Sequence, residues 1–379
     1  MIINKAYKFR LYPTEQQAKQ LAVEFGCARF VWNRALVERE YAYQQWNVPL
    51  SAQFDISKNI TQYKKSERYS FLNEATASVL TQKLIDQDKA FANFFAGRAK
   101  FPKFKKKNHA QSIRYSLDPR QNNFEPGEML KLPKLGELNV RWSETPQGRP
   151  KMVTVSKSSS GKYFASFACE VQVMEKPKTG KRVGVDVGIK DVIVTSDGYR
   201  SGAPKFTYFY QRKLKKAQRN LDRKTKGSNR WKKQRLVVAR LHELIANSRK
   251  DFLHKETTRL VKENDLICLE DLNVSGMLKN RKLSKAVADV GIAELNRQIK
   301  YKAAWYGKEV VVIDRWYPSS KTCHGCGQKH PMPLDKRVMS CDCGVEMDRD
   351  LNAAINIRTV GEIGLARGAS HQSAIAQAA

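Results

Sequence analysis

Residues 182–189 read Arg182-Val-Gly-Val-Asp-Val-Gly-Ile189, an apolar stretch with one acidic residue in its middle. The pattern is typical of a buried β-strand, and a second strand that ends in a turn is predicted over 191–198. A carboxylate inside a buried strand costs free energy unless a cation or hydrogen bonds compensate its charge. Asp186 therefore indicates a site where the fold holds a cation.

Two further acids stand at the ends of apolar segments downstream. Glu270 closes the predicted strand Leu266-Ile-Cys-Leu-Glu270, and Asp350 lies near the amino end of a short helix predicted over 348–356. Between Glu270 and Asp350, a helix is predicted first and then a third apolar strand over 310–313. The order strand, strand, helix, strand, helix predicts an α/β domain.

A single acid at a strand end is commonly just a solvent-facing residue. Together, Asp186, Glu270 and Asp350 offer the oxygen ligands that hard divalent cations such as Mg²⁺ or Mn²⁺ take. Two such ions about 4 Å apart activate a water and stabilise the leaving oxygen of a phosphodiester. The three carboxylates are therefore predicted to be magnesium ligands and catalytic residues of a metal-dependent nuclease.

The overall charge of the chain indicates the kind of partner it binds. The 379 residues include 69 Lys and Arg against 37 Asp and Glu, which gives a net charge of +32 and a pI near 9.9. Such a balance indicates a polyanion, with nucleic acid as the first candidate. Residues 205–262 hold 19 Lys and Arg and 4 acids and are broken near Gly227-Ser228, which predicts a basic helical hairpin. A solvated face is the ordinary alternative, but this concentration of charge favours a polyanion.

The amino-terminal half has a different pattern. An alternating strand over 3–11 is followed by a helix start at Thr14, with Gln17 placed to complete a capping box. A mostly helical segment follows, and short alternating strands from 112 to about 173 predict a small β-barrel or sheet that the first strand joins. Residues 98–107 interleave cations with aromatic rings, which favours nucleic-acid contact over a solvated loop.

The two ends of the chain carry weaker signals. No apolar run reaches the about 18 residues of a membrane span, and residues 1–10 lack the apolar stretch of a signal peptide. We therefore expect the protein to remain in the cytoplasm. The tail after Val360 is rich in Ala, Gly, Ser and Gln, which predicts disorder.

Four of the seven cysteines fall in two close pairs, Cys323-His-Gly-Cys326 and Cys341-Asp-Cys343. In a chain without an export signal this clustering favours a metal over disulfides, and two such knuckles are typical of a zinc ribbon. Because C-x-C leaves less room than C-x-x-C for the usual tight turn, His330 or His324 could replace one cysteine as a ligand of the zinc. Four protein ligands leave no open position, so the zinc is predicted to be structural.

These residues lie within a series of motifs that resembles the TnpB family, nucleases carried by bacterial and archaeal insertion sequences and related to the type V CRISPR effectors. The resemblance covers nearly the whole chain, with the motifs in the same order. The matching segments are Tyr7-Lys-Phe-Arg-Leu-Tyr-Pro13, Gly26-Cys-Ala-Arg-Phe-Val-Trp-Asn33, Phe101-Pro-Lys-Phe104, Gly184-Val-Asp-Val-Gly188, Glu270-Asp-Leu272, Ser319-Ser-Lys-Thr-Cys323 and Asp348-Arg-Asp-Leu-Asn-Ala-Ala354.

The resemblance implies an α/β multidomain fold, in which a zinc ribbon interrupts a RuvC (RNase H-like) nuclease domain and a wedge β-barrel carries a helical recognition domain. It also implies that Asp186, Glu270 and Asp350 are catalytic. Asp350 is chosen over Asp348 because it directly precedes Leu-Asn-Ala-Ala. The expected boundaries are 1–11 and 112–178 for the wedge barrel, 12–111 for the recognition domain, 179–318 and 347–360 for the RuvC domain, 319–346 for the ribbon and 361–379 for the disordered tail.

The resemblance further implies an RNA-guided DNA endonuclease. Such a protein binds a guide RNA from the transposon end, cuts double-stranded target DNA beside a short adjacent motif and favours transposon retention. We expect a monomer with its RNA, without a membrane partner, in a bacterial or archaeal cytoplasm.

Three other functions are considered. An RNA-guided DNA-binding repressor without cleavage is disfavoured because all three carboxylates are present. A transposase or recombinase that acts on DNA ends also uses three acids, but the ribbon beside the last acid and the aromatic and basic helical half fit guided cleavage better. A type V CRISPR effector is a close variant, and the short chain favours the transposon protein.

Overall fold

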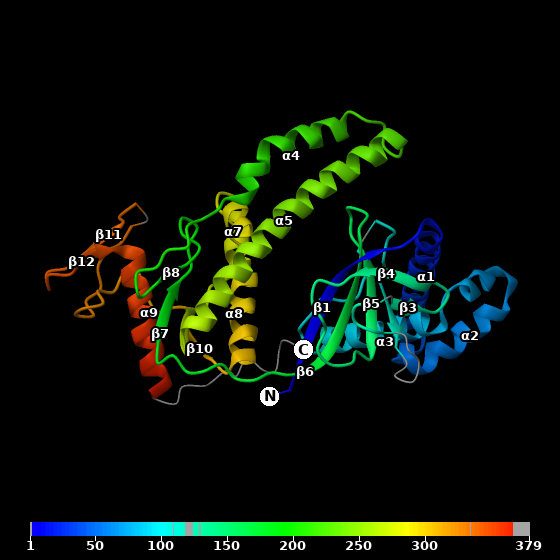
Figure 1. The fold of residues 1–379 in the computed structure, drawn as a ribbon, viewed down its shortest axis with the longest axis horizontal. Helices are drawn as coiled ribbons and strands as arrows, with labels where there is room; N and C mark the ends of the chain where they lie inside the picture. The colour runs from blue at the N-terminus through cyan, green and yellow to red at the C-terminus, as the bar shows by residue number, and fades with distance from the viewer. Residues whose placement is uncertain (1, 109, 118–123, 129, 334, 367–379) are drawn as a thin grey trace. The chain divides into compact units, whose positions relative to one another are not determined.

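The computed structural model describes residues 2–108, 110–117, 124–128, 130–333 and 335–366 (Figure 1). The chain divides into two compact units, with the division between Val171 and Gln172. The first unit holds a β-sheet with a helical insertion. The second holds a sheet covered by helices on both faces and a small two-stranded ribbon. This division falls earlier than residue 178, where the polar linker suggested the boundary.

The sheet of the first unit uses strands from both ends of that unit. Its strands are β1 (Ile2–Tyr12), β2 (Gln111–Ser116), β3 (Leu130–Leu132), β4 (Gly136–Arg141), β5 (Met152–Lys157) and β6 (Tyr163–Gln172). Their order is β2-β5-β6-β1-β4-β3, so the amino-terminal strand lies inside the sheet, as predicted. The sheet is nearly closed, and the rings of Phe9, Trp142 and Phe167 pack together in its interior.

The helices of the first unit are inserted between β1 and β2. They are α1 (Glu15–Trp46), α2 (Ser57–Lys65) and α3 (Ala77–Phe95), with a π-helical turn at Ala52–Ile56 and a 3₁₀ segment at Glu67–Glu74. The predicted capping box starts α1: Thr14 Oγ1 accepts from the Gln17 amide at 3.3 Å, and Gln17 Oε1 accepts from the Thr14 amide at 2.9 Å. The helix ends at Asn47, whose φ of 54° is left-handed.

The basic and aromatic segment 98–107 is partly held by the helices. Phe101 packs edge-on against Phe91 and Phe94 of α3, and the Lys105 ammonium lies 3.6 Å from the centre of the Trp32 ring. These contacts give part of the cation and ring pattern a structural role, which the sequence alone did not distinguish from nucleic-acid contact.

The second unit is built on a four-stranded sheet of order β10-β9-β7-β8. Strands β7, β9 and β10 are parallel, and β8 runs antiparallel to β7. The strands are β7 (Arg182–Asp186), β8 (Val194–Thr195), β9 (Leu266–Glu270), β10 (Glu309–Ile313), and, in the separate ribbon, β11 (Val338–Ser340) and β12 (Glu346–Asp348). The helices are α4 (Phe206–Asp222), α5 (Asn229–Glu263), α6 (Val274–Lys279), α7 (Ser284–Val290), α8 (Ile292–Tyr306) and α9 (Arg349–Ala366).

Both faces of this sheet are covered, which explains why its strands are continuous apolar runs. On one face Ile267 and Leu269 of β9 pack in a core shared with α5 and α8. On the other face Leu266 and Cys268 pack with Ile357 of α9.

Two glycines allow α9 to lie directly against the strands. A Cβ atom on Gly184 of β7 would collide with the Ala354 carbonyl and the Arg358 amide of the helix. A Cβ atom on Gly361 would collide with the Cys268 sulfur of β9. Because Asp350 lies in the first turn of the same helix, this close packing fixes where that acid lies relative to the sheet.

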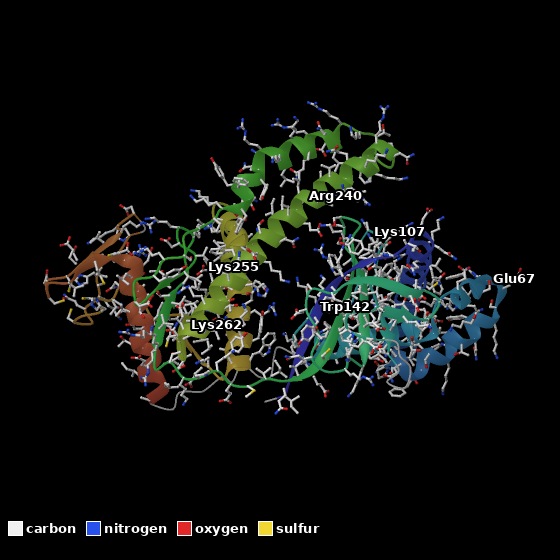
Figure 2. All side chains as sticks on the ribbon, viewed as in Figure 1. Glu67, Lys107, Trp142, Arg240, Lys255 and Lys262 are labelled. Carbon is white, nitrogen blue, oxygen red and sulfur yellow. The ribbon has the colours of Figure 1, made fainter. Side chains whose placement is uncertain are left out.

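The predicted basic hairpin is present as the antiparallel helices α4 and α5, joined by a turn at Gly227, whose φ is +89°. Figure 2 shows its side chains projecting from both helices into solvent, with Arg240 and Lys255 labelled. In the part of the chain that the structure describes, we find no helix long and apolar enough to cross a membrane.

Two expectations need correction. The strand predicted over 191–198 pairs with β7 only at Val194–Thr195, because the Val192 amide and the Ile193 carbonyl bond instead to Gly202 and Ser201 of the segment that folds back after it. The tail predicted to be disordered from 361 is helical to Ala366, since Gly361 packs on the sheet. Residues 367–379 lie outside the described part of the chain.

Candidate functional site

Asp186 and Glu270 leave the sheet side by side. Strands β7 and β9 are parallel, with Val185 paired to Leu269, so the next residue of each strand is an acid at the carboxyl edge. Glu270 is also in register with Ile313 at the end of β10. Both acids are only partly exposed.

The charge of the third predicted acid, Asp350, acts on Asp186. Burial raises the pKa of Asp186 to about 8, and the charges of Glu270 and Asp350 add to this effect while Arg349 opposes it. Burial also raises the pKa of Glu270. The Ser319 hydroxyl donates a hydrogen bond to Glu270 Oε1, which partly offsets this rise. The structure thus brings the three sequence-predicted acids into one electrostatic site, in which their negative charges oppose each other.

Asp348 has a different role from Asp350. Its Oδ1 accepts hydrogen bonds from the Asp350 and Leu351 amides, at 2.9 and 3.1 Å, and pairs with Arg200 Nη2 at 2.6 Å. Burial would raise the pKa of Asp348, but these hydrogen bonds keep it below its usual value. Asp348 therefore caps the start of α9, which agrees with the choice of Asp350 as the third acid.

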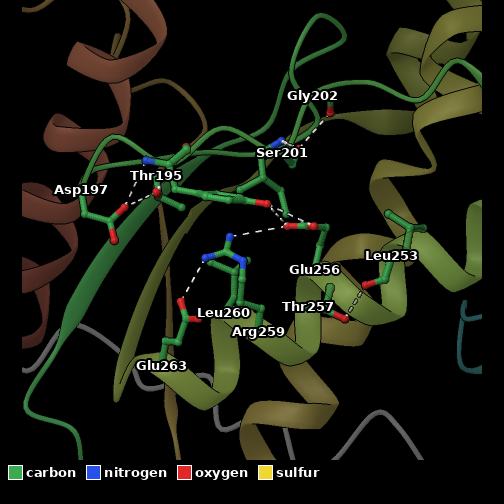
Figure 3. A network of polar contacts seen from close by, with 12 residues as sticks. Thr195, Asp197, Ser201, Gly202, Leu253, Glu256, Thr257, Arg259, Leu260 and Glu263 are labelled. Atoms are coloured by element: carbon green, nitrogen blue, oxygen red, sulfur yellow. Dashed lines mark hydrogen bonds and ion pairs between the residues drawn. The ribbon is translucent and has the colours of Figure 1, made fainter.

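The turn that follows β8 and carries Arg200 is held on α5 by a polar network (Figure 3). The Tyr199 hydroxyl donates to Glu256 at 3.0 Å, and the Arg259 guanidinium lies 3.4 Å from the centre of the Tyr199 ring. Arg259 also pairs with Glu263 at 3.0 Å. The network connects α5, through Tyr199 and Arg200, to the amino end of α9.

The four cysteines converge as predicted. The sulfur atoms of Cys323, Cys326, Cys341 and Cys343 all lie within 4.8 Å of one another. Among the described residues, the three carboxylates do not form a group as close as this. Cys323 and Cys343 are 3.6 Å apart between sulfurs, and Cys326 and Cys341 are 3.5 Å apart. Tetrahedral zinc with bonds of about 2.3 Å separates its sulfurs by about 3.8 Å, so the cluster fits that geometry.

Each cysteine pair sits on a turn closed by a glycine. Gly327 and Gly344 have φ of +78° and +91°, and the Gly344 amide donates to the Cys341 carbonyl at 3.0 Å. The shorter C-x-C spacing thus still forms a knuckle. Burial disfavours ionisation of Cys323, but the Cys326 and Gly325 amides outweigh it and lower the pKa of Cys323 to about 7.

The two histidines considered as alternative ligands differ in position. His330 Nε2 lies 3.1 Å from the Cys341 sulfur, at the edge of the cluster. His324 instead turns toward α9, where its amide donates to Asn352 Oδ1 at 3.0 Å. Of the two, His330 is the one that lies beside the sulfurs.

Three residues that position these groups, Ser319, Asn352 and Asn356, were not predicted from the sequence. Asn352 and Asn356 are buried on α9, and both donate to the Thr322 carbonyl, at 2.7 and 2.6 Å. Asn356 also donates to the Ser319 carbonyl at 2.8 Å, next to the hydroxyl that bonds Glu270. The available signal was two amides four residues apart on a helix that is otherwise apolar at its buried positions. They join the loop before Cys323 to the helix that carries Asp350.

Three family models match the chain. One described as "Probable transposase" matches residues 166–281, one described as "Cas12f1-like, TNB domain" matches 293–357, and one described as "Helix-turn-helix domain" matches 1–47. The described residues of the last segment form strand β1 and the single long helix α1, so its name does not correspond to the local structure.

Curated relatives match over nearly the full chain. One from Streptomyces pristinaespiralis is 42% identical over 364 residues, which covers 95% of this chain and 90% of the relative. One from Escherichia coli K12 is 33% identical over 389 residues, which covers 97% of this chain and 95% of the relative. Both are named "Putative RNA-guided DNA endonuclease", the second with the suffix InsQ.

A solved structure described as "Cryo-EM structure of the Cas12f1-sgRNA-target DNA complex" has the same fold. It matches with a TM-score of 0.55 and 15% identity over 94% of this chain and 99% of that chain. The predicted fold class, a RuvC (RNase H-like) α/β domain together with a β-barrel that carries helices, is thereby confirmed. With relatives this similar over their whole length, the chain belongs to the TnpB family.

Proposed function

We propose that this protein is an RNA-guided DNA endonuclease whose active site consists of Asp186, Glu270 and Asp350. The observation that carries the proposal is the convergence of these acids: parallel register sets Asp186 beside Glu270, and α9 brings the charge of Asp350 close to Asp186. Partly buried carboxylates that repel each other suit a site that binds cations. The names of the full-length relatives support the same activity.

The three carboxylates would hold two Mg²⁺ or Mn²⁺ ions, which when bound supply an activated water and stabilise the leaving oxygen of a phosphodiester. The surrounding residues hold the ligands in place. Ser319 orients Glu270 through its hydroxyl, and Asp348 with Arg200 fixes the first turn of α9.

The four cysteines would hold one zinc ion in a closed, structural site. Their sulfur spacings fit tetrahedral zinc, and the loop before Cys323 is bonded to α9 through Asn352 and Asn356. The ion would contribute its binding free energy to folding and take no part in hydrolysis.

The guide RNA and the target DNA would be bound largely through their phosphates. The chain carries a net charge of +32, and Lys213, Lys216 and Arg223 of the basic hairpin are exposed. Such cations hold polyanions without selecting a sequence. Sequence choice would come from base pairing between guide and target.

In the cell, the guide would come from the transposon end, and the protein would act as a monomer with that RNA in the bacterial or archaeal cytoplasm. Cutting beside a short adjacent motif would favour retention of the transposon. A transposase that acts on DNA ends is the second candidate, because the family model that matches 166–281 is described as "Probable transposase". RNA dependence of cutting separates the two functions.

The active-site assignment is tested with alanine variants of the four acids, each purified with its RNA. Asp186→Ala, Glu270→Ala and Asp350→Ala should bind RNA and target DNA but lose cleavage, as the wild type should when divalent ions are chelated. Asp348→Ala is the comparison: loss of the helix cap lowers stability by about 0.5–2 kcal/mol and loosens the turn that carries Asp350, so cutting should be slowed but not lost. Cleavage near the wild-type rate in any of the first three variants would refute the assignment.

A further inference from the structure

Trp316 is the most exposed of the six tryptophans, at 84%, and it lies in the short connection between strand β10 and Ser319. It follows strand β10, whose last residue, Ile313, is in register with Glu270 at the carboxyl edge of the sheet. Three residues after Trp316, the Ser319 hydroxyl donates a hydrogen bond to Glu270. The indole is therefore attached to the same short connection that orients a proposed metal ligand.

The backbone that carries Trp316 is held on both sides. Its amide donates to Asp314 Oδ1 at 2.7 Å, and the Tyr317 amide donates to the Asp314 carbonyl at 3.2 Å. Arg315 is fixed on Asp271, the residue after Glu270, through its Nε to the carbonyl at 3.0 Å and an ion pair at 2.5 Å. The exposed indole thus stands on a fixed turn.

The neighbouring aromatic residue lies differently. Tyr317 packs against the core between β9, β10 and α9, whereas Trp316 stays in solvent. Leaving a large apolar side chain exposed forgoes about 1.5–3 kcal/mol of burial free energy. An exposed ring on a held turn, in a connection that contacts a proposed metal ligand, has the form of a stacking platform, because every base has a flat face and stacks on an indole.

We infer that Trp316 stacks on one nucleobase of the DNA strand that enters the carboxylate site, close to the phosphodiester that is cut. This inference rests on the proposed function and deepens it. Stacking accepts any base, which suits an enzyme whose sequence choice comes from its guide. Its place in the connection that contacts Glu270 and Asp271 favours the DNA substrate over the guide RNA as the partner. Trp316 would act as a positioning residue that holds the strand in register with the acids.

The test removes one base at a time from the target strand around the cut and measures single-turnover cleavage by the complex of protein and guide RNA. The wild type should lose rate when one particular base is absent. Trp316→Ala should cut intact DNA about 5- to 150-fold more slowly and be indifferent to that missing base. Trp316→Phe should recover most of the rate. Trp46→Ala, which removes another exposed indole, should keep the wild-type sensitivity.

A second readout does not need cleavage. In the Asp186→Ala background, 2-aminopurine placed at the sensitive position should be quenched on binding, and Trp316→Ala should remove the quenching while zinc content and guide RNA are retained. The inference would be overturned if the Trp316→Ala variant cut DNA at the wild-type rate and still quenched 2-aminopurine. If the variant lost only its guide RNA, the ring would be assigned to the RNA. Absence of cutting by the wild type would contradict the proposed function, and the quenching would still decide the role of Trp316.

Discussion

Asp186 shows how one partly buried charge affects both stability and metal binding. Its pKa lies at about 8 in the folded chain, against about 3.9 for an aspartate in an unfolded one. Between these values the unfolded chain releases a proton that the folded chain keeps, so the metal-free fold loses stability as pH rises through this range. A divalent cation that binds the carboxylate reverses this loss.

We therefore expect Asp186→Asn to stabilise the metal-free protein. The gain should be about 1–3 kcal/mol near pH 8 and should shrink toward pH 4, where the folded wild type is neutral at Asp186 and the unfolded chain is only about half ionised there. Denaturant titration in a chelator at several pH values measures it, with exposed Asp222→Asn as the control. Added Mg²⁺ should stabilise the wild type and not the variant. A variant that is less stable than the wild type at pH 8 would contradict the proposed cause.

Ser319 gives a second test at a single residue. Its hydroxyl bonds Glu270 and favours the ionised carboxylate, so Ser319→Ala should raise the pKa of Glu270 further and weaken metal binding. We expect a 10- to 100-fold loss in apparent Mg²⁺ affinity, typical of a residue that holds a metal ligand. Titration of cleavage with Mg²⁺ measures it, and Ser275→Ala, at an exposed hydroxyl, should behave as the wild type. Unchanged Mg²⁺ dependence would show that Ser319 does not orient Glu270.

Sequence patterns predicted the acids but not the residues around them. Asp186 and Glu270 were recognisable because a charge inside an apolar strand is costly, and the four cysteines were recognisable by their spacing. Ser319, Asn352 and Asn356 were missed because a hydroxyl or amide side chain does not reveal which distant group it bonds. Their partners are set by how α9 packs on the sheet, which depends on contacts far apart in the chain.

At the scale of an element, α9 and the two-stranded ribbon act together. Strands β7, β9 and β10 were predicted from their apolar runs, whereas the length of α9 was not. The Ala- and Gly-rich composition after Val360 suggested disorder, yet Gly361 is the residue that allows the helix to lie on Cys268. A glycine that serves close packing and one that breaks a helix cannot be distinguished from one sequence.

The cysteine cluster yields a prediction for this element. Cys323→Ser or Cys326→Ser should release zinc and lower the free energy of unfolding, because a closed site contributes its binding free energy to folding. Metal analysis together with thermal unfolding checks both effects, and Cys169→Ser, which lies in the other unit, serves as the control that keeps zinc. Purified wild type without one zinc per chain would refute the site. Zinc retained in Cys343→Ser would point to His330 as the fourth ligand.

At the scale of the whole molecule, charge is the dominant feature. The basic hairpin was predicted from the count of Lys and Arg in 205–262, and helices α4 and α5 carry those cations into solvent (Figure 2). Neutralising Lys213, Lys216 and Arg223 to Gln should weaken nucleic-acid binding for every sequence alike. The slope of log affinity against log salt should fall by about 0.7–0.9 for each phosphate that the variant no longer neutralises.

The matched control for that variant removes the same charge elsewhere. Lys19 and Arg297 each pair with an acid on their own helix at 2.8 Å, and Lys151 lies 3.8 Å from Glu170, all three outside the hairpin. Their triple Gln variant should bind with nearly the wild-type salt slope. Equal slopes in the two triple variants would mean that the hairpin acts only through net charge.

RNA guidance is the central claim, and one measurement tests it most directly. The protein is purified with two RNAs that differ only in the guide segment, and each complex is incubated with Mg²⁺ and a DNA that carries both target sites. We expect each complex to cut only the site complementary to its guide, and protein freed of RNA to cut neither site. Cutting at one fixed site with either guide, or by RNA-free protein, would contradict it and favour a self-sufficient nuclease or transposase.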